Sequence, residues 1–217
     1  MHGQRVTVPV GIRQAHATVA MYSVPARVAQ AIVDYSGLRV LQYRPGKATC
    51  SVLFVNYVDG DLGKYHEYGV GFLVRHPSAP GLRTGDLRSL LRGRAGVFIH
   101  RLPVDQAHAG SGQVDTGHRA ALQIDGRLVA DFAVTPGLPV PGASTSLDAY
   151  THMDGVLRRV PWKMTASGTR TRPGGARLEL GDHPWAEELP ALGLPKLAML
   201  STTIACLQMS FGEAEIV

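Results

Sequence analysis

Polar and apolar positions in this chain alternate mostly with the two-residue period of a β-strand. Nine short runs, rich in β-branched and aromatic residues and bounded by glycine, proline or aspartate, fit half-buried strands. They cover residues 16–22, 48–57, 67–75, 96–102, 120–124, 128–134, 162–171, 176–180 and 204–211. The Asp125-Gly126 pair between two of these runs predicts a hairpin, because such pairs readily adopt the positive φ angles of a two-residue turn.

Three stretches show a helical period instead. Apolar residues of 25–34 recur on one stripe, between Ser23 as a candidate N-cap and Gly37 as a terminator. Segments 84–92 and 183–192 show the same kind of pattern. Because strands outnumber helices and no regular strand–helix–strand alternation is present, the pattern predicts a mostly β (α+β) fold with antiparallel strands, and not a dinucleotide-binding fold.

The composition is typical of a globular domain. Its 217 residues, 45% of them hydrophobic, are enough to bury a core. No apolar run approaches the ~20 residues of a membrane-spanning helix, so no membrane contact is expected. We therefore expect a single domain over 1–217, and the absence of a signal-peptide pattern favours the cytoplasm. Cys50 and Cys206 lie in apolar runs, which favours free thiols over a disulfide.

The net charge of +5 comes from arginine much more than from lysine. The chain has only four lysines, which are Lys47, Lys64, Lys163 and Lys196. The densest basic stretch, 83–94, is interleaved with glycine and leucine and has few aromatic residues, so we do not expect nucleic acid as a partner. We interpret it as a solvated helix face; an oligomeric scaffold that contacts an acidic partner through this stretch is an alternative.

Common catalytic and metal-binding motifs are absent from the sequence. It contains no phosphate-binding loop, no dinucleotide fingerprint, no H-E-x-x-H and no G-x-S-x-G. His100, His108 and His118 are separated by eight and ten residues, which matches no compact zinc-ligand spacing. We therefore expect neither a metal nor a cofactor.

Three segments, in this order, resemble the acetoacetate decarboxylase-like superfamily. They are YVDGDLGKYHEYGVGFLV at 57–74, GVFIHRLPVDQ at 96–106, and the C-terminal stretch 181–217 with its GDHPW and LGLP motifs. Together with Tyr22 and the RPGK of 44–47, they extend the likeness over most of the chain. The resemblance implies a cone-shaped antiparallel β-barrel with a few covering helices, a small-molecule substrate and assembly into a homo-oligomer.

The resemblance also implies a lysine nucleophile, and here the sequence departs from the family. Family decarboxylases form a Schiff base between a neutral lysine and the keto group of a β-keto acid, which requires a depressed lysine pKa. The matching stretch, 109–122, contains no lysine, and the lysine position falls on His118, Arg119 or Ala120. An arginine keeps its proton, and a histidine forms no stable imine. We therefore expect no Schiff base from this segment.

Other site residues follow from the same resemblance and from residue chemistry. Glu67 matches an acidic residue of the family pocket, and burial in an apolar barrel would raise its pKa and suit it to general acid–base catalysis. His118 or Arg119 is expected to face it, as proton donor or anion clamp. A competing interpretation pairs Glu67 with an arginine and leaves His118 exposed. The expected substrate-binding residues are Tyr65, Tyr68, Tyr22 and His100.

The expected activity is a lyase-, isomerase- or cyclase-type reaction on a keto- or enol-containing small molecule, such as a β-keto acid or a polyketide-like compound. It would use acid–base or templating catalysis without a Schiff base. A barrel that only binds a small molecule is the alternative. Lys163 and Lys196 lie in other segments, and the imine route stays open if either enters the pocket.

Overall fold

The structure is a computed structural model that describes residues 7–77, 95–104, 110–115 and 118–217. The mostly β prediction is confirmed. The strands are β1 (Val10–Pro25), β2 (Arg39–Val40), β3 (Gln42–Arg44), β4 (Lys47–Gly60), β5 (Tyr65–Arg75), β6 (Gly96–Arg101), β7 (Gly110–Asp115), β8 (Arg119–Ile124), β9 (Arg127–Val134), β10 (Leu138–Pro139), β11 (Ala143–Met153), β12 (Val156–Arg172), β13 (Ala176–Leu180), β14 (Leu200–Phe211) and β15 (Glu215–Ile216). The helical segments are α1 (Ala26–Val33), the 3-10 turn η1 (Asp34–Ser36) and α3 (Pro184–Ala191).

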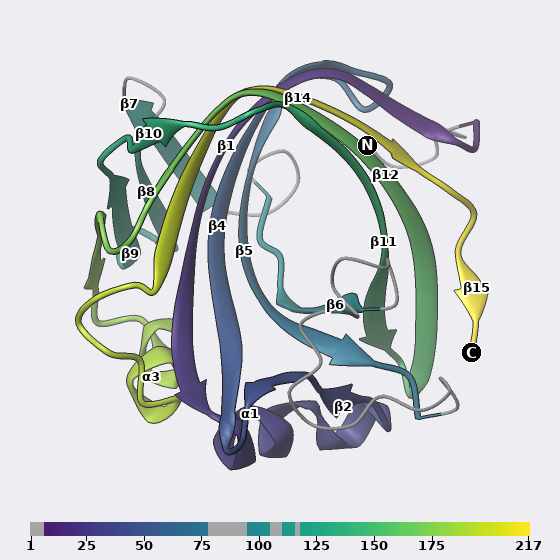
Figure 1. The fold of residues 1–217 in the computed structure, drawn as a ribbon, viewed down its shortest axis with the longest axis vertical. Helices are drawn as coiled ribbons and strands as arrows, with labels where there is room; N and C mark the ends of the chain where they lie inside the picture. The colour runs from purple at the N-terminus through teal and green to yellow at the C-terminus, as the bar shows by residue number, and fades with distance from the viewer. Residues whose placement is uncertain (1–6, 78–94, 105–109, 116–117) are drawn as a thin grey trace.

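Within the described residues, seven strands close into a barrel (Figure 1). Their order is β5-β6-β11-β12-β14-β1-β4, and β4 pairs back with β5. The predicted barrel is confirmed with one correction. The β6–β11 pair is parallel, so the barrel is mixed and not purely antiparallel. Between these two strands the chain forms β7, β8 and β9, and β11 then runs alongside β6 in the same direction. The later strand β13 pairs with β9 and completes a second sheet in the order β13-β9-β8-β7.

Two aspartate–glycine turns join neighbouring strands. The predicted hairpin at Asp125-Gly126 is confirmed, with φ angles of 52° and 74° between β8 and β9. Asp154 and Gly155, with φ angles of 54° and 76°, make the corresponding turn between β11 and β12. The periodicity argument missed β11 because its sequence, ASTSLDAYTHM, is largely polar. The Asp154-Gly155 pair was the available signal for it.

Helix α1 forms where the apolar stripe predicted a helix, and Gly37, with φ of 74°, ends η1 after it. Its predicted cap is wrong. Pro25 occupies the N-cap position without a side-chain hydrogen bond, while Ser23 lies in β1 and its hydroxyl contacts the Tyr43 hydroxyl at 2.6 Å. Helix α3 matches the third predicted helix, whereas 84–92 lies outside the described residues. No described helix has the length and apolarity to cross a membrane.

The apolar core is divided between the two faces of the barrel wall. Side chains alternate along a strand, and the β4–β5 register is regular, so Val55 and Glu67 share one face while Phe54 and Tyr68 share the other. We call these the Glu67 face and the tyrosine face. The smaller apolar cluster contains Val55, and the larger one, which also includes residues of α1, α3, β8 and β9, contains Phe54 and Tyr68.

Candidate functional site

Two tyrosine hydroxyls are buried on the tyrosine face without a hydrogen-bond partner among the described residues. Tyr22 and Tyr68 expose only 2% and 4% of their surface. Burial raises the pKa of Tyr22 to about 12 and also raises the pKa of Tyr68, and Cys50 interacts electrostatically with both phenols. Both phenols therefore keep their protons at neutral pH. A buried hydroxyl without a partner is costly, so these groups are suited to donate to a bound ligand.

His100 presents an unpartnered ring nitrogen at the end of β6. Its Nε2 lies 3.0 Å from Oε2 of Glu188 in α3, while its Nδ1 is buried with no partner among the described residues. Burial lowers the pKa of His100 more than the Glu188 carboxylate raises it. The imidazole is therefore neutral at pH 7. With the Nε2 proton donated to Glu188, Nδ1 carries a free lone pair and can act as a base.

Arg101 and Trp185 hold the carboxylate that orients His100. The Arg101 guanidinium donates to both oxygens of Glu188, and its Cζ lies 4.9 Å from the centroid of the Trp185 ring. Burial would raise the pKa of Glu188, but hydrogen bonds from Arg101 and His100 lower it overall. Glu188 is thus an ionised acceptor at neutral pH. Sequence reasoning missed this residue, because nothing in the helical pattern of 183–192 indicates a contact with β6.

The register connects His100 to the buried tyrosines. Phe72 of β5 pairs with Cys50 and with Phe98, so all three side chains lie on the tyrosine face. The His100 ring makes an edge contact with Phe72, with ring centroids 6.0 Å apart. Tyr22, Tyr68 and His100, three of the four expected substrate-binding residues, therefore lie on one face. The fourth, Tyr65, lies on the other.

Glu67 is a buried carboxyl on the Glu67 face of β5. The residue is 8% exposed, and burial raises its pKa to about 7. The hydrogen bond from Tyr57 lowers this pKa, but by less than burial raises it. The Tyr57 hydroxyl lies 3.3 Å from Oε1, and the Tyr57 ring stacks on Tyr65 at 4.2 Å between centroids. Its hydrogen-bond partner among the described residues is therefore a tyrosine and not an arginine. Near neutral pH such a group can give or take a proton.

His118 and Arg119, the expected partners of Glu67, lie elsewhere. Both are exposed, and Arg119 donates to the two carboxylate oxygens of Asp131 at 3.1 and 2.6 Å, which lowers the pKa of Asp131. Arg119 and Ala120 line a small pocket with Phe54, a residue of the tyrosine face. Strand alternation puts Glu67 on the opposite face, so the structure does not bring these groups together.

Of the three residues on which the family lysine was expected to fall, His118 and Arg119 are exposed, and Ala120 is buried. Ala120 is 3% exposed and belongs to the larger cluster with Tyr22 and Tyr68. None of the four lysines, all of which the structure describes, is buried; three are exposed, and Lys47 is partly exposed. No group of three or more metal-ligating side chains converges among the described residues.

Comparisons with known proteins agree with this fold. The family model described as acetoacetate decarboxylase (ADC) matches residues 3–112. No curated protein sequence matches the chain significantly. The enduracididine biosynthesis enzyme MppR, complexed with the condensation product of pyruvate and imidazole 4-carboxaldehyde, has a TM-score of 0.66 at 14% identity, covering 99% of this chain and 92% of that one.

Two further solved structures have the same fold. One comes from structural studies of acetoacetate decarboxylase, with a TM-score of 0.64 and 14% identity over 97% of this chain and 90% of that one. The other is an acetoacetate decarboxylase-like enzyme from Sphingomonas wittichii RW1, with a TM-score of 0.54 and 14% identity over 100% and 98% of the two chains.

Proposed function

Since the chain belongs to the acetoacetate decarboxylase family, we propose that it is a lyase-, isomerase- or cyclase-type enzyme that acts on a keto- or enol-containing small molecule without a Schiff base. The β-keto acids and polyketide-like compounds are the substrate classes proposed. One observation carries the proposal. The Tyr22 and Tyr68 hydroxyls and Nδ1 of His100 lie on one face, all buried without a partner among the described residues.

The proposed chemistry begins with proton transfer from carbon. Nδ1 of His100 takes a proton from the carbon next to a substrate carbonyl, and the electron pair of the broken C–H bond moves onto the carbonyl oxygen as an enolate. The hydroxyls of Tyr22 and Tyr68 donate hydrogen bonds to that oxygen, where negative charge develops. The enolate can then react in three ways. Return of the proton to a different carbon gives isomerisation, and attack of the enolate carbon on a second carbonyl of the same molecule gives cyclisation. Loss of a leaving group from the β-carbon gives a lyase reaction.

Keto acids are the first substrates to examine. MppR, a protein of this fold, has been solved in complex with a condensation product of pyruvate. In deuterium oxide, wild-type protein should exchange the methyl protons of pyruvate or the C2 protons of acetoacetate faster than buffer does, as followed by proton NMR. Heat-denatured protein is the control. Saturable binding of both compounds without any exchange would instead favour a barrel that only binds small molecules.

The absence of Schiff-base chemistry is a separate prediction. Borohydride added with acetoacetate should leave the mass of the protein unchanged, because a lysine must be desolvated to be neutral at pH 7, and none of the four lysines is buried. Intact-protein mass spectrometry measures this, with a family decarboxylase as the positive control. A reduced adduct located by peptide mapping on Lys163 or Lys196 would restore the imine mechanism.

A further inference from the structure

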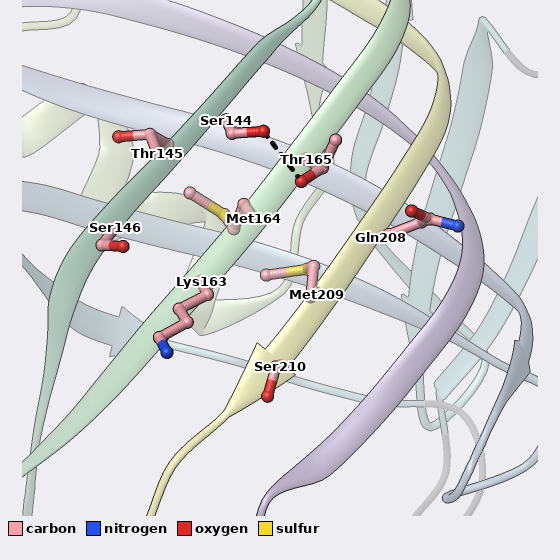
Figure 2. Close-up of a pocket in the computed structure, with 9 residues that line it drawn as sticks. All are labelled: Ser144, Thr145, Ser146, Lys163, Met164, Thr165, Gln208, Met209 and Ser210. Atoms are coloured by element: carbon pink, nitrogen blue, oxygen red, sulfur yellow. Dashed lines mark hydrogen bonds between the residues drawn. The ribbon is translucent and has the colours of Figure 1, made fainter.

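A cavity of about 480 Å³ lies over three neighbouring strands, and neither Tyr22 nor Tyr68 lines it. Three consecutive residues from each of β11, β12 and β14 line it (Figure 2). Its volume falls within the usual range of small-molecule sites. The lining residues are Ser144, Thr145, Ser146, Lys163, Met164, Thr165, Gln208, Met209 and Ser210.

The strand register explains the shape of this cavity. Ser144, Thr165 and Gln208 pair across the strands as one row, and Ser146, Lys163 and Ser210 pair as another. The two rows are separated by two residues along each strand, so their side chains stand on the same face. The row between them, Thr145–Met164–Met209, points its side chains to the opposite face. The side chains of the two outer rows are exposed or partly exposed, whereas Met209 is buried in the smaller apolar cluster. The side of the cavity that is open to solvent is therefore the one that carries the two polar rows, and we call it the trough.

The trough carries a single charge, which is positive. Lys163 is exposed and forms no ion pair within the described part of the chain, and no acidic side chain lines the cavity. Around it stand hydroxyl groups and one amide, which can donate or accept hydrogen bonds. The Ser144 and Thr165 hydroxyls, which belong to the same row, are hydrogen-bonded to each other (Figure 2), with 3.0 Å between their oxygens.

We propose that this trough binds a small polar carboxylate, such as a keto or hydroxy acid. The Lys163 ammonium pairs with the carboxylate, and the hydroxyls of Ser146 and Ser210, in the same row, bond to the carboxylate and to the adjacent keto or hydroxy group. Because the ion pair faces water, we expect millimolar affinity and a clear dependence on salt. The proposal rests on the trough alone and does not depend on catalysis at the tyrosine face.

The four lysines allow a direct test by NMR. In protein labelled with ¹³C at the lysine ε-carbon, addition of pyruvate should shift the Lys163 signal saturably, with the four signals assigned from lysine-to-methionine variants. Pyruvamide, which has the same shape but no charge, should bind at least about tenfold more weakly. The Ser146→Ala and Ser210→Ala variants should each weaken pyruvate binding by about threefold or more, and Lys196→Met should leave it unchanged.

Two results would overturn the proposal. One is a Lys163 signal that moves no more than that of Lys196, and the other is equal affinity for pyruvamide and pyruvate. The tyrosine-face assignment is tested separately, because the Lys163 shift should persist in Tyr68→Phe whatever that variant does to isotope exchange. Absence of exchange in wild-type protein would likewise leave the Lys163 titration interpretable.

Discussion

The His100→Gln variant should exchange deuterium into pyruvate or acetoacetate about 10²–10⁴ times more slowly than wild-type protein, the usual range for losing a general base. Glutamine is close in size and can still donate to Glu188, but its amide nitrogen has no basic lone pair to replace Nδ1. Exchange rates from proton NMR, measured over a range of pH, provide the test. Retained exchange in a folded variant would remove His100 from the mechanism.

Two further variants separate catalysis by His100 from a structural role. His152→Gln alters another partly exposed histidine, whose ring contacts Tyr35 at 4.9 Å between centroids, and it should leave exchange within about twofold of wild type. Glu188→Gln keeps the shape of the partner but removes its charge. As a positioning residue, Glu188 should affect both the rate and the pH profile, since its carboxylate raises the pKa of His100 and its loss lowers that pKa further.

The pH profile of the wild type has a defined direction. Because burial lowers the pKa of His100, the base form persists below the ordinary histidine pKa of about 6.5. The exchange rate should therefore stay level as the pH falls through that value and decrease only at lower pH. A decrease that begins well above pH 6.5 would instead indicate a group with a raised pKa, such as Glu67.

The Glu67→Gln variant should be more stable than wild-type protein at pH 8.5 by about 3 kcal/mol. The carboxyl has a pKa of about 7 when folded against an ordinary value of 4.5, and each pH unit of difference corresponds to about 1.4 kcal/mol. The folded state therefore binds more protons than the unfolded state between these values. Wild-type stability falls as pH rises from about 4.5 to about 7 and levels off above that. Glutamine has no such penalty.

Urea unfolding at pH 5, 7 and 8.5 tests this, with Glu213→Gln, an exposed glutamate, as the matched control. The stability difference between Glu67→Gln and wild type should grow with pH, whereas the control should run parallel to wild type. Parallel curves for both variants would contradict a raised pKa at Glu67. Deuterium exchange should survive the Glu67→Gln change; a loss of about 10²-fold or more would return the catalytic acid–base role to Glu67.

Part of the candidate site was accessible from the sequence. Tyr22, Tyr68 and His100 were identified from residue type and resemblance, and they lie on one face of the barrel wall. The raised pKa of Glu67 followed from its place in an apolar strand. The residues around Glu67 could not be predicted from the sequence, because a shift of one residue in the pairing of β4 and β5 would have moved Glu67 to the tyrosine face.

Local signals in the chain therefore account for nine of the fifteen strands that the structure describes, for the Asp125-Gly126 hairpin and for the absence of lysine from segment 109–122, since each depends on residues close together in sequence. Folding in three dimensions was needed for the parallel β6–β11 pair, the face that each side chain takes, and the contact between His100 and Glu188, which are 88 positions apart. These features depend on the register between distant strands and on the packing of α3 against β6. No periodicity within a single segment carries that information.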